Sequence, residues 1–129
     1  MKGTLVVFAA TTFLAGCGGI SAFTHLSDPS QPLRSHRAKV CVLPGMLPEE
    51  FKYTEVGKVT ASRSRRDTSE ALRLAVVNEA RRVGADVVLN LDENAQAWDV
   101  VRPTTKAIAV RLTPDSPRLE CEKLGGKLL

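Results

Sequence analysis

The side chains of this 129-residue chain that could do chemistry are few, and three of them are cysteines, at positions 17, 41 and 121. A thiol can carry a covalent lipid, close a disulfide or ligate a soft metal. The two histidines, His25 and His36, could act as a general base or a metal ligand. The neighbours of each residue decide which of these reactions the sequence supports.

Cys17 directly follows an apolar segment. Lys2 supplies one positive charge, and residues 4–15 are apolar or small, which is typical of a secretory signal. The run has 12 residues, whereas a membrane-spanning helix needs roughly 20. The four residues Leu14-Ala15-Gly16-Cys17 resemble a bacterial lipobox.

This resemblance implies a lipoprotein signal peptide over residues 1–16 and cleavage before Cys17. The Cys17 thiol would be diacylglycerylated and its new amino group acylated, and more than one acyl chain makes a stable membrane anchor. Gly18 stands where aspartate tends to retain lipoproteins in the inner membrane. We therefore expect the outer membrane of a Gram-negative bacterium, with the domain facing the periplasm. The alternatives are an ordinary signal peptide containing a cysteine, or a buried cytosolic thiol.

The charge of the chain is mildly basic, with a formal net charge of +4. Removing residues 1–16 takes away Lys2 alone among the charged residues, leaving 17 basic and 14 acidic side chains. This balance does not call for a nucleic-acid partner, and we predict none. A basic surface in the periplasm could meet lipid phosphates or peptidoglycan carboxylates, or it could be solvated.

Cys41 and Cys121 remain once Cys17 is assigned to lipidation. An oxidising compartment permits a disulfide, and bridging residues 80 apart would stabilise the fold by roughly 4 kcal/mol. Two free buried thiols are the alternative. The pair could also bind a soft metal with a histidine, but no second ligand lies near either cysteine, so we predict no metal site.

Residues 17–37 contain prolines, serines and no sustained periodicity, which indicates the lipidated cysteine followed by a flexible tether. Both histidines fall in this segment. We expect a small folded domain over 38–113 and a C-terminal tail over 114–129.

One helix is clear within that domain, over residues 68–83. Asp67 is a good N-cap, and Glu70 three residues later completes an aspartate version of the capping box. Gly84 is the expected residue after the helix end.

Short apolar or alternating runs predict four strands around this helix. Gly57, inside the second run, suggests a bulge or a close backbone approach. The element order β-β-α-β-β predicts an α+β fold, a small and mostly antiparallel sheet of about four strands with one helix on one face. The expected strands are 39–43, 55–62, 86–91 and 106–112.

Two surface features could contact a partner. Arg63, Arg65 and Arg66 form a basic turn that could grip a phosphate or carboxylate, or be a solvated loop. Trp98 stands in a polar stretch and could be an interface residue or part of the core.

The segment Val56-Gly57-Lys58-Val59-Thr60, the helix, and Gly84-Ala85-Asp86-Val87-Val88-Leu89-Asn90 resemble a set of small bacterial domains. These are the Rcs-phosphorelay outer-membrane sensor lipoproteins and the YbjQ-type domains, which are named for heavy-metal binding. The Rcs sensors carry two disulfides and a longer proline-rich tether, which this chain lacks. The resemblance implies a domain that acts by binding partner proteins.

The sequence contains no catalytic constellation. We find no G-x-S-x-G, no H-E-x-x-H and no glycine-rich phosphate loop. We therefore predict a non-enzymatic, cofactor-free, lipid-anchored envelope protein, a sensor or scaffold with an envelope-protein partner. The alternative is a periplasmic module that binds a small ligand or a heavy metal.

Overall fold

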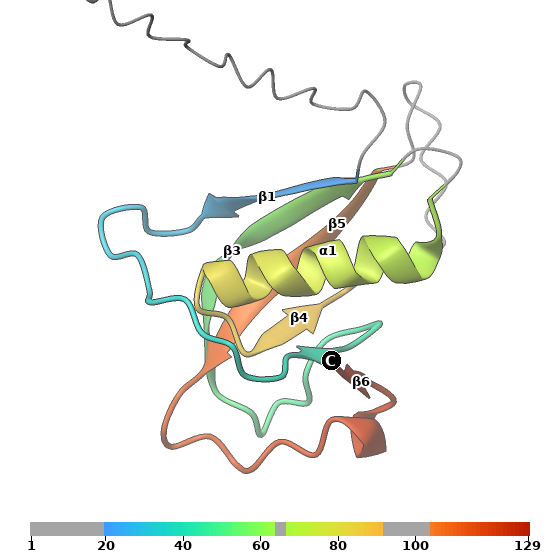
Figure 1. The fold of residues 1–129 in the computed structure, drawn as a ribbon. Coiled ribbons are helices and arrows are strands. Elements are labelled where there is room, and N and C mark those ends of the chain that lie inside the picture. Colours follow the sequence, from blue (N-terminus) through green and yellow to red (C-terminus); the bar gives the residue numbers. More distant parts are fainter. Residues whose placement is uncertain (1–19, 64–66, 92–103) are drawn as a thin grey trace, which may run out of the picture.

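In the described part of the chain, a six-stranded sheet carries one α-helix on one face (Figure 1). The computed structural model describes residues 20–63, 67–91 and 104–129. The strands lie in the order β1-β3-β5-β4-β2-β6 across the sheet. The elements are β1 (Ser21–Leu26), β2 (Cys41–Val42), β3 (Tyr53–Ser62), α1 (Ser69–Arg82), β4 (Val87–Leu89), β5 (Thr104–Leu112), the 3-10 helix η1 (Glu122–Leu124) and β6 (Lys127–Leu128).

The α+β class is confirmed, but the expectation of about four strands is wrong. All neighbouring strands pair antiparallel except β2 and β4, which pair in parallel, so the sheet is mixed. The four expected strands are present as β2, β3, β4 and β5. The two further strands, β1 and β6, form the two edges of the sheet.

The strand β1 lies in the segment for which the sequence predicts a flexible tether. Its six residues pair with β3 in an antiparallel register that runs from Ser21 opposite Ser62 to Leu26 opposite Gly57. The described fold therefore begins well before residue 38. The periodicity of β1 is hard to recognise because its alternating residues are only half buried, and its order depends on pairing with distant β3.

The C-terminal residues also join the sheet, whereas the sequence predicts a tail. Strand β6 pairs antiparallel with β2, and the amide of Val40 donates to the carbonyl of Leu129 at 2.6 Å. Both contacts link residues far apart in the chain, so no local sequence pattern predicts them.

Helix α1 is confirmed, with a different N-cap from the one predicted. Thr68 caps the helix, and its hydroxyl accepts from the amide of Ala71 at 3.1 Å. Asp67 therefore lies one residue before the cap. Gly84 follows the helix with φ of +82°, as its predicted role after the helix end requires.

Two apolar clusters lie on the two faces of the sheet. The helix-side core packs α1 on the sheet through residues that include Val59, Leu72, Val76, Val77, Val88 and Ala109. The loop-side core lies on the opposite face under the connections that follow β2 and β5, and includes Leu43, Leu47, Val87, Leu89 and Val110.

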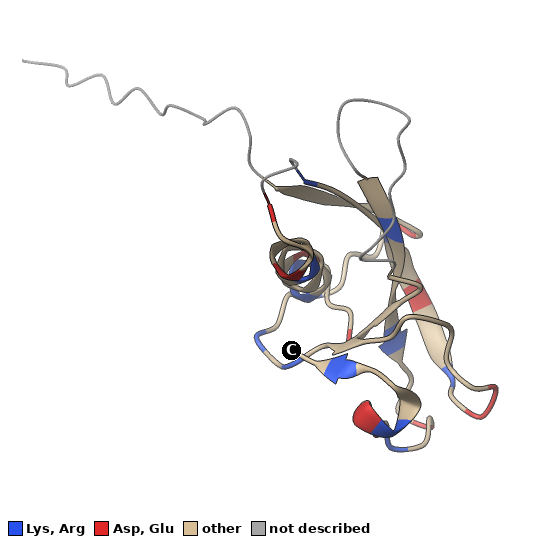
Figure 2. Ribbon diagram, turned by 90° about the vertical axis from the view of Figure 1, so that its right-hand side faces the viewer, with Lys and Arg blue, Asp and Glu red and all other residues tan. Residues whose placement is uncertain are grey.

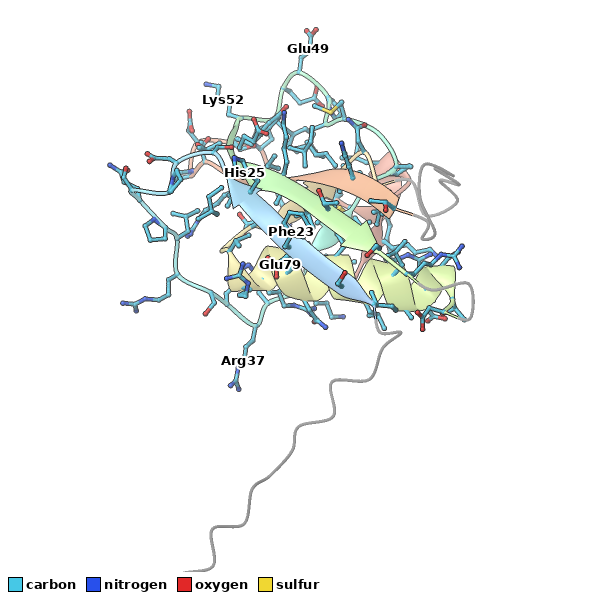
Figure 3. All side chains as sticks on the ribbon, turned by 90° about the horizontal axis from the view of Figure 1, so that it is seen from above. Phe23, His25, Arg37, Glu49, Lys52 and Glu79 are labelled. Atoms are coloured by element: carbon cyan, nitrogen blue, oxygen red, sulfur yellow. A yellow bond between two sulfur atoms is a disulfide. The ribbon has the colours of Figure 1, made fainter. Side chains whose placement is uncertain are left out.

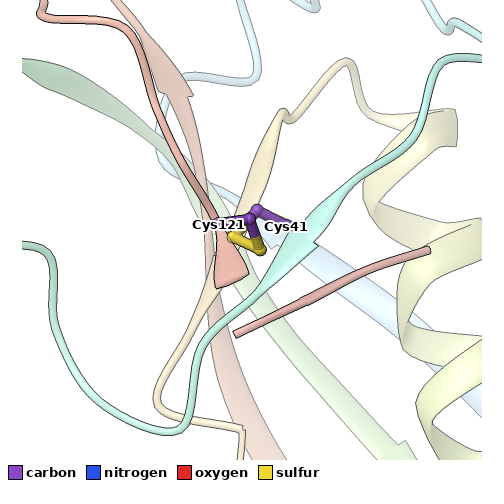
Figure 4. The surroundings of a disulfide bond; sticks show 2 residues. All are labelled: Cys41 and Cys121. Carbon is purple, nitrogen blue, oxygen red and sulfur yellow. A yellow bond between two sulfur atoms is a disulfide. The ribbon is translucent and has the colours of Figure 1, made fainter. Parts of the chain in front are cut away.

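The disulfide predicted between Cys41 and Cys121 is confirmed, with the two Cα atoms 5.7 Å apart. Figure 4 shows Cys41 on β2 and Cys121 on the C-terminal segment before η1. Both residues are buried in the loop-side core. The bridge therefore holds the C-terminal segment against the face of the sheet that points away from α1.

In the described parts of the chain, no helix is long and apolar enough to cross a membrane.

Candidate functional site

The face of β1, β3 and β5 that points away from α1, which we call the outer face, is the candidate functional surface. Side chains alternate between the two faces of a strand. Residues that alternate with the outer-face positions, such as Val59, Ala61 and Ala107, pack in the helix-side core. Strand register aligns the outer-face positions in three rows. The rows are Ser21–Ser62–Thr104, Phe23–Thr60–Lys106 and His25–Lys58–Ile108.

Phe23 is the most conspicuous residue of the outer face, since 61% of its surface is exposed. It stands on the edge strand, next to Thr60 in the same row. Figure 3 shows Phe23 and His25 on β1, with Glu79 on the neighbouring helix. An aromatic side chain with this exposure on an edge strand is available for contact with another surface.

The three rows of the outer face carry only basic charge, while Glu55, opposite Val110 of the loop-side core, is an acidic position of β3 on the same face beyond these rows. The three rows contain Lys58 and Lys106 and no acidic residue. Both lysines are exposed and make no hydrogen bond or ion pair with any other described residue. As far as the described residues go, the two ammonium groups are therefore available for an anionic partner.

A polar cluster under β1 holds this edge strand against α1. The Thr24 hydroxyl donates to Glu79 Oε1 at 2.9 Å, and the Arg82 guanidinium donates to both Glu79 oxygens at 2.6 and 2.9 Å. The Glu79 side chain is only 10% exposed. The hydrogen bond from Arg82, and next the one from Thr24, lower the pKa of Glu79 against the opposing effect of burial.

The histidines do not lie in a tether, which corrects the prediction. His25 is on β1 in the outer face. His36 Nε2 donates to the carbonyl of Ala85 at 2.7 Å, and its Nδ1 accepts from the amide of Ala38 at 3.1 Å. Both ring nitrogens of His36 are thus used in packing.

The segment around His36 wraps the C-terminal end of α1. The His36 amide donates to the carbonyl of Arg81 at 3.1 Å, and Arg81 Nε donates back to the carbonyl of Ala38 at 2.9 Å. A Cβ added to Gly84 would lie 2.6 Å from Leu33 Cβ. Glycine therefore lets this segment approach the helix end closely.

Of the predicted arginine turn, only Arg63 is among the described residues. Its Nη1 donates to the carbonyl of Asp67 at 2.6 Å, so it closes the connection from β3 to α1. Arg65, Arg66, Trp98 and Cys17 lie outside the described residues, together with the whole expected signal peptide.

A small pocket beside the C-terminal end of β1 contains two carboxylates, Asp28 and Glu55, among mostly apolar side chains. The Asp28 carboxylate accepts from the amide and the hydroxyl of Ser30, so it serves a local turn. Within the described ranges, no cluster of three or more His, Cys, Asp or Glu residues could hold a metal ion.

Sequence reasoning missed the outer face as a surface. The lysines and Phe23 are far apart in the chain and meet only through the pairing of β1 with β3. The alternation over residues 21–26 was the one available signal.

No family model, no curated protein and no solved structure matches this chain. The resemblance to the Rcs sensors and YbjQ-type domains therefore stays a hypothesis.

Proposed function

We propose that this chain is a lipid-anchored protein of the bacterial cell envelope whose small domain binds other envelope components and performs no catalysis. The observation that carries the proposal is the disulfide between Cys41 and Cys121. Disulfides persist in exported proteins and are rare in the cytosol. Export agrees with the signal-like residues 1–16 and the lipobox ending at Cys17.

The use of the reactive side chains supports a binding role. Cys41 and Cys121 are oxidised to a disulfide, so neither is a nucleophile. His36 uses both ring nitrogens in structural hydrogen bonds. What the domain presents instead is the outer face, with exposed Phe23 and two lysines that pair with no other residue of the described ranges.

The anchor is tested by replacing Cys17 with serine in the producing bacterium and following the chain by membrane fractionation and incorporation of labelled palmitate. We expect the variant to lose the label and to leave the membrane fraction, whereas Thr12→Ser, a small change outside the lipobox, keeps both. A Cys17→Ser chain that remains fully membrane-bound and acylated would contradict the proposal. Separation of the inner and outer membranes tests the expected outer-membrane location.

The binding role is tested by in-cell photocrosslinking from two positions, Thr60 on the outer face and Asn78 on the exposed side of α1. Capture of a defined envelope component from one position supports an interaction domain. Turnover of a substrate by the purified protein would instead make it an enzyme and refute the binding role.

A further inference from the structure

We infer that the outer face of β1, β3 and β5 docks on the anionic headgroups of the membrane leaflet that holds the Cys17 anchor. This inference rests on the proposed lipid anchor and adds which surface of the domain the membrane contacts. It follows from the reach of the chain, the charge of the three rows and the engagement of Arg81 and Arg82 at the C-terminal end of α1.

The reach of the chain keeps β1 beside the membrane. Only Gly18, Gly19 and Ile20 separate Cys17 from the first residue of β1. A fully extended chain spans at most about 3.5 Å per residue, so Ser21 lies within about 14 Å of the lipidated residue and Phe23 within about 21 Å. With the expected tether replaced by a strand, the domain has no long spacer from the headgroups.

The outer face has the composition of a membrane-contacting surface. Lys58 and Lys106 are exposed, and no acidic side chain lies in the three rows. Each lysine close to an anionic leaflet adds a modest attraction, and the anchor raises the effective concentration of the face at the membrane. Exposed Phe23 is an apolar side chain of the kind that membrane-surface segments bury at the boundary of headgroups and acyl chains.

The basic residues of α1 are engaged within the domain. Arg82 is paired with Glu79, and Arg81 donates to the carbonyl of Ala38 and to Asn78 Oδ1. The Arg82 ion pair thus helps to hold α1 against β1, and Arg81 binds α1 to the segment near His36. The outer-face lysines have no such partners among the described residues.

Several acidic residues lie in connections at the other end of the sheet. Strand β3 starts, and β5 ends, at the end opposite Ser21, and the connections there carry Glu49, Glu50, Asp115, Glu120 and Glu122. In Figure 2 the red positions of these connections lie in the lower part of the view. The connections at the Ser21 end also carry acidic residues, since Asp67 follows Ser62 and Asp92, Glu93 and Asp99 precede Thr104 in the chain.

A second copy of the chain is a poorer occupant of the outer face. Stacking two such faces would bring the lysines of both copies into one interface with no acidic residue in the rows to neutralise them. Like charges facing each other disfavour association. An anionic leaflet offers the complementary charge.

The test uses the lipidated full-length product purified from membranes and reconstituted into vesicles. One set contains neutral phosphatidylcholine, and the other contains about 30% phosphatidylglycerol. Trace acetylation of lysines, read by mass spectrometry, reports the accessibility of Lys58 and Lys106. Exposed Lys39 and Lys127, which lie outside the outer face, are controls in the same molecule.

We expect acetylation of Lys58 and Lys106 to be roughly fivefold slower on the anionic vesicles than on the neutral ones. Acetylation of Lys39 and Lys127 should be unchanged, and about 0.5 M NaCl should remove the protection. Phe23→Ser, a change at an exposed position, should reduce the protection without altering the thermal unfolding of the domain.

Three results would overturn the inference, and each is distinguishable. A chain that does not float with neutral vesicles refutes the lipid anchor, and the docking with it. A chain that floats but shows equal acetylation on both vesicles refutes the docking alone. Protection that is independent of lipid charge and increases with protein density assigns the outer face to a second copy.

Discussion

The carboxylate of Glu79 joins the helix to the edge strand through its hydrogen bonds with Thr24 and Arg82. Because these donors lower the pKa of Glu79 in the folded protein, the unfolded chain takes up the proton first as the pH falls below about 4.3. The stabilisation is therefore complete above that pH and is lost as the pH falls through the folded-state pKa.

We predict that Glu79→Gln lowers the free energy of unfolding by about 1–2 kcal/mol at pH 7. The estimate is modest because 64% of the Arg82 side chain is exposed. Urea unfolding at pH 7 and pH 3 should show a smaller gap between wild type and variant at the lower pH. Glu49→Gln, in an exposed connection, is the control. An equal gap at both pH values would contradict this role of Glu79.

His36 and His25 form a matched pair of histidines in different surroundings. His36 bonds through both ring nitrogens, whereas His25 is exposed on β1. We predict that His36→Phe costs about 1–3 kcal/mol, because the carbonyl of Ala85 and the amide of Ala38 lose a partner. His25→Phe should change the free energy of unfolding by less than about 0.5 kcal/mol. Thermal unfolding of both variants checks this, and equal effects would refute the distinction.

At the scale of the elements, the pairing of β1 with β3 depends on Gly57. A Cβ there would lie 2.5 Å from the carbonyl oxygen of His25 and 2.7 Å from Thr24 Cγ2. The predicted bulge is confirmed by a register shift between Glu55 and Gly57 in the pairing of β3 with β5. The glycine thus serves both roles that the sequence suggested.

We predict that Gly57→Ala displaces β1 and lowers the free energy of unfolding by roughly 1–3 kcal/mol. Hydrogen exchange should show faster exchange in β1 than in wild type, with β4 and β5 less affected. Gly45→Ala is the matched control, since a Cβ at Gly45 meets nothing within 4 Å. Unchanged protection of β1 in Gly57→Ala would argue against the close approach.

The elements that the sequence predicts are those whose signals are local. Helix α1 has apolar residues at helical spacing and a glycine at its end, and β5 alternates over nine residues. Strands β1 and β6 hold their places through partners distant in the chain. The two-residue length of β6 leaves no periodicity to read.

At the scale of the whole molecule, the disulfide closes the fold across 80 positions of the chain. We predict that the double variant Cys41→Ser, Cys121→Ser is less stable by roughly 4 kcal/mol, mainly because its unfolded chain is less constrained. Denaturant unfolding of both proteins, with and without a reductant, measures the difference. Reductant should destabilise the wild type alone, and a wild type insensitive to full reduction would contradict the prediction.

The candidate site was less predictable than the fold. The cysteine pairing could be proposed because only two cysteines remained after Cys17. The outer face could not, because Phe23, Lys58 and Lys106 become neighbours only when β1 pairs with β3 and β3 with β5. Surface composition depends on register, and register is fixed by contacts between distant segments.

The position of β1 has a mechanical consequence. A pull applied before Ser21 acts along the strand, so its hydrogen bonds with β3 bear the load together instead of opening one after another. Once β1 yields, the chain can be drawn out only as far as Cys41, where the disulfide passes the force directly to Cys121. The 24 residues from 17 to 40 would extend to a length of at most about 80 Å. Tension on the anchor would thus lengthen this molecule in a single bounded step.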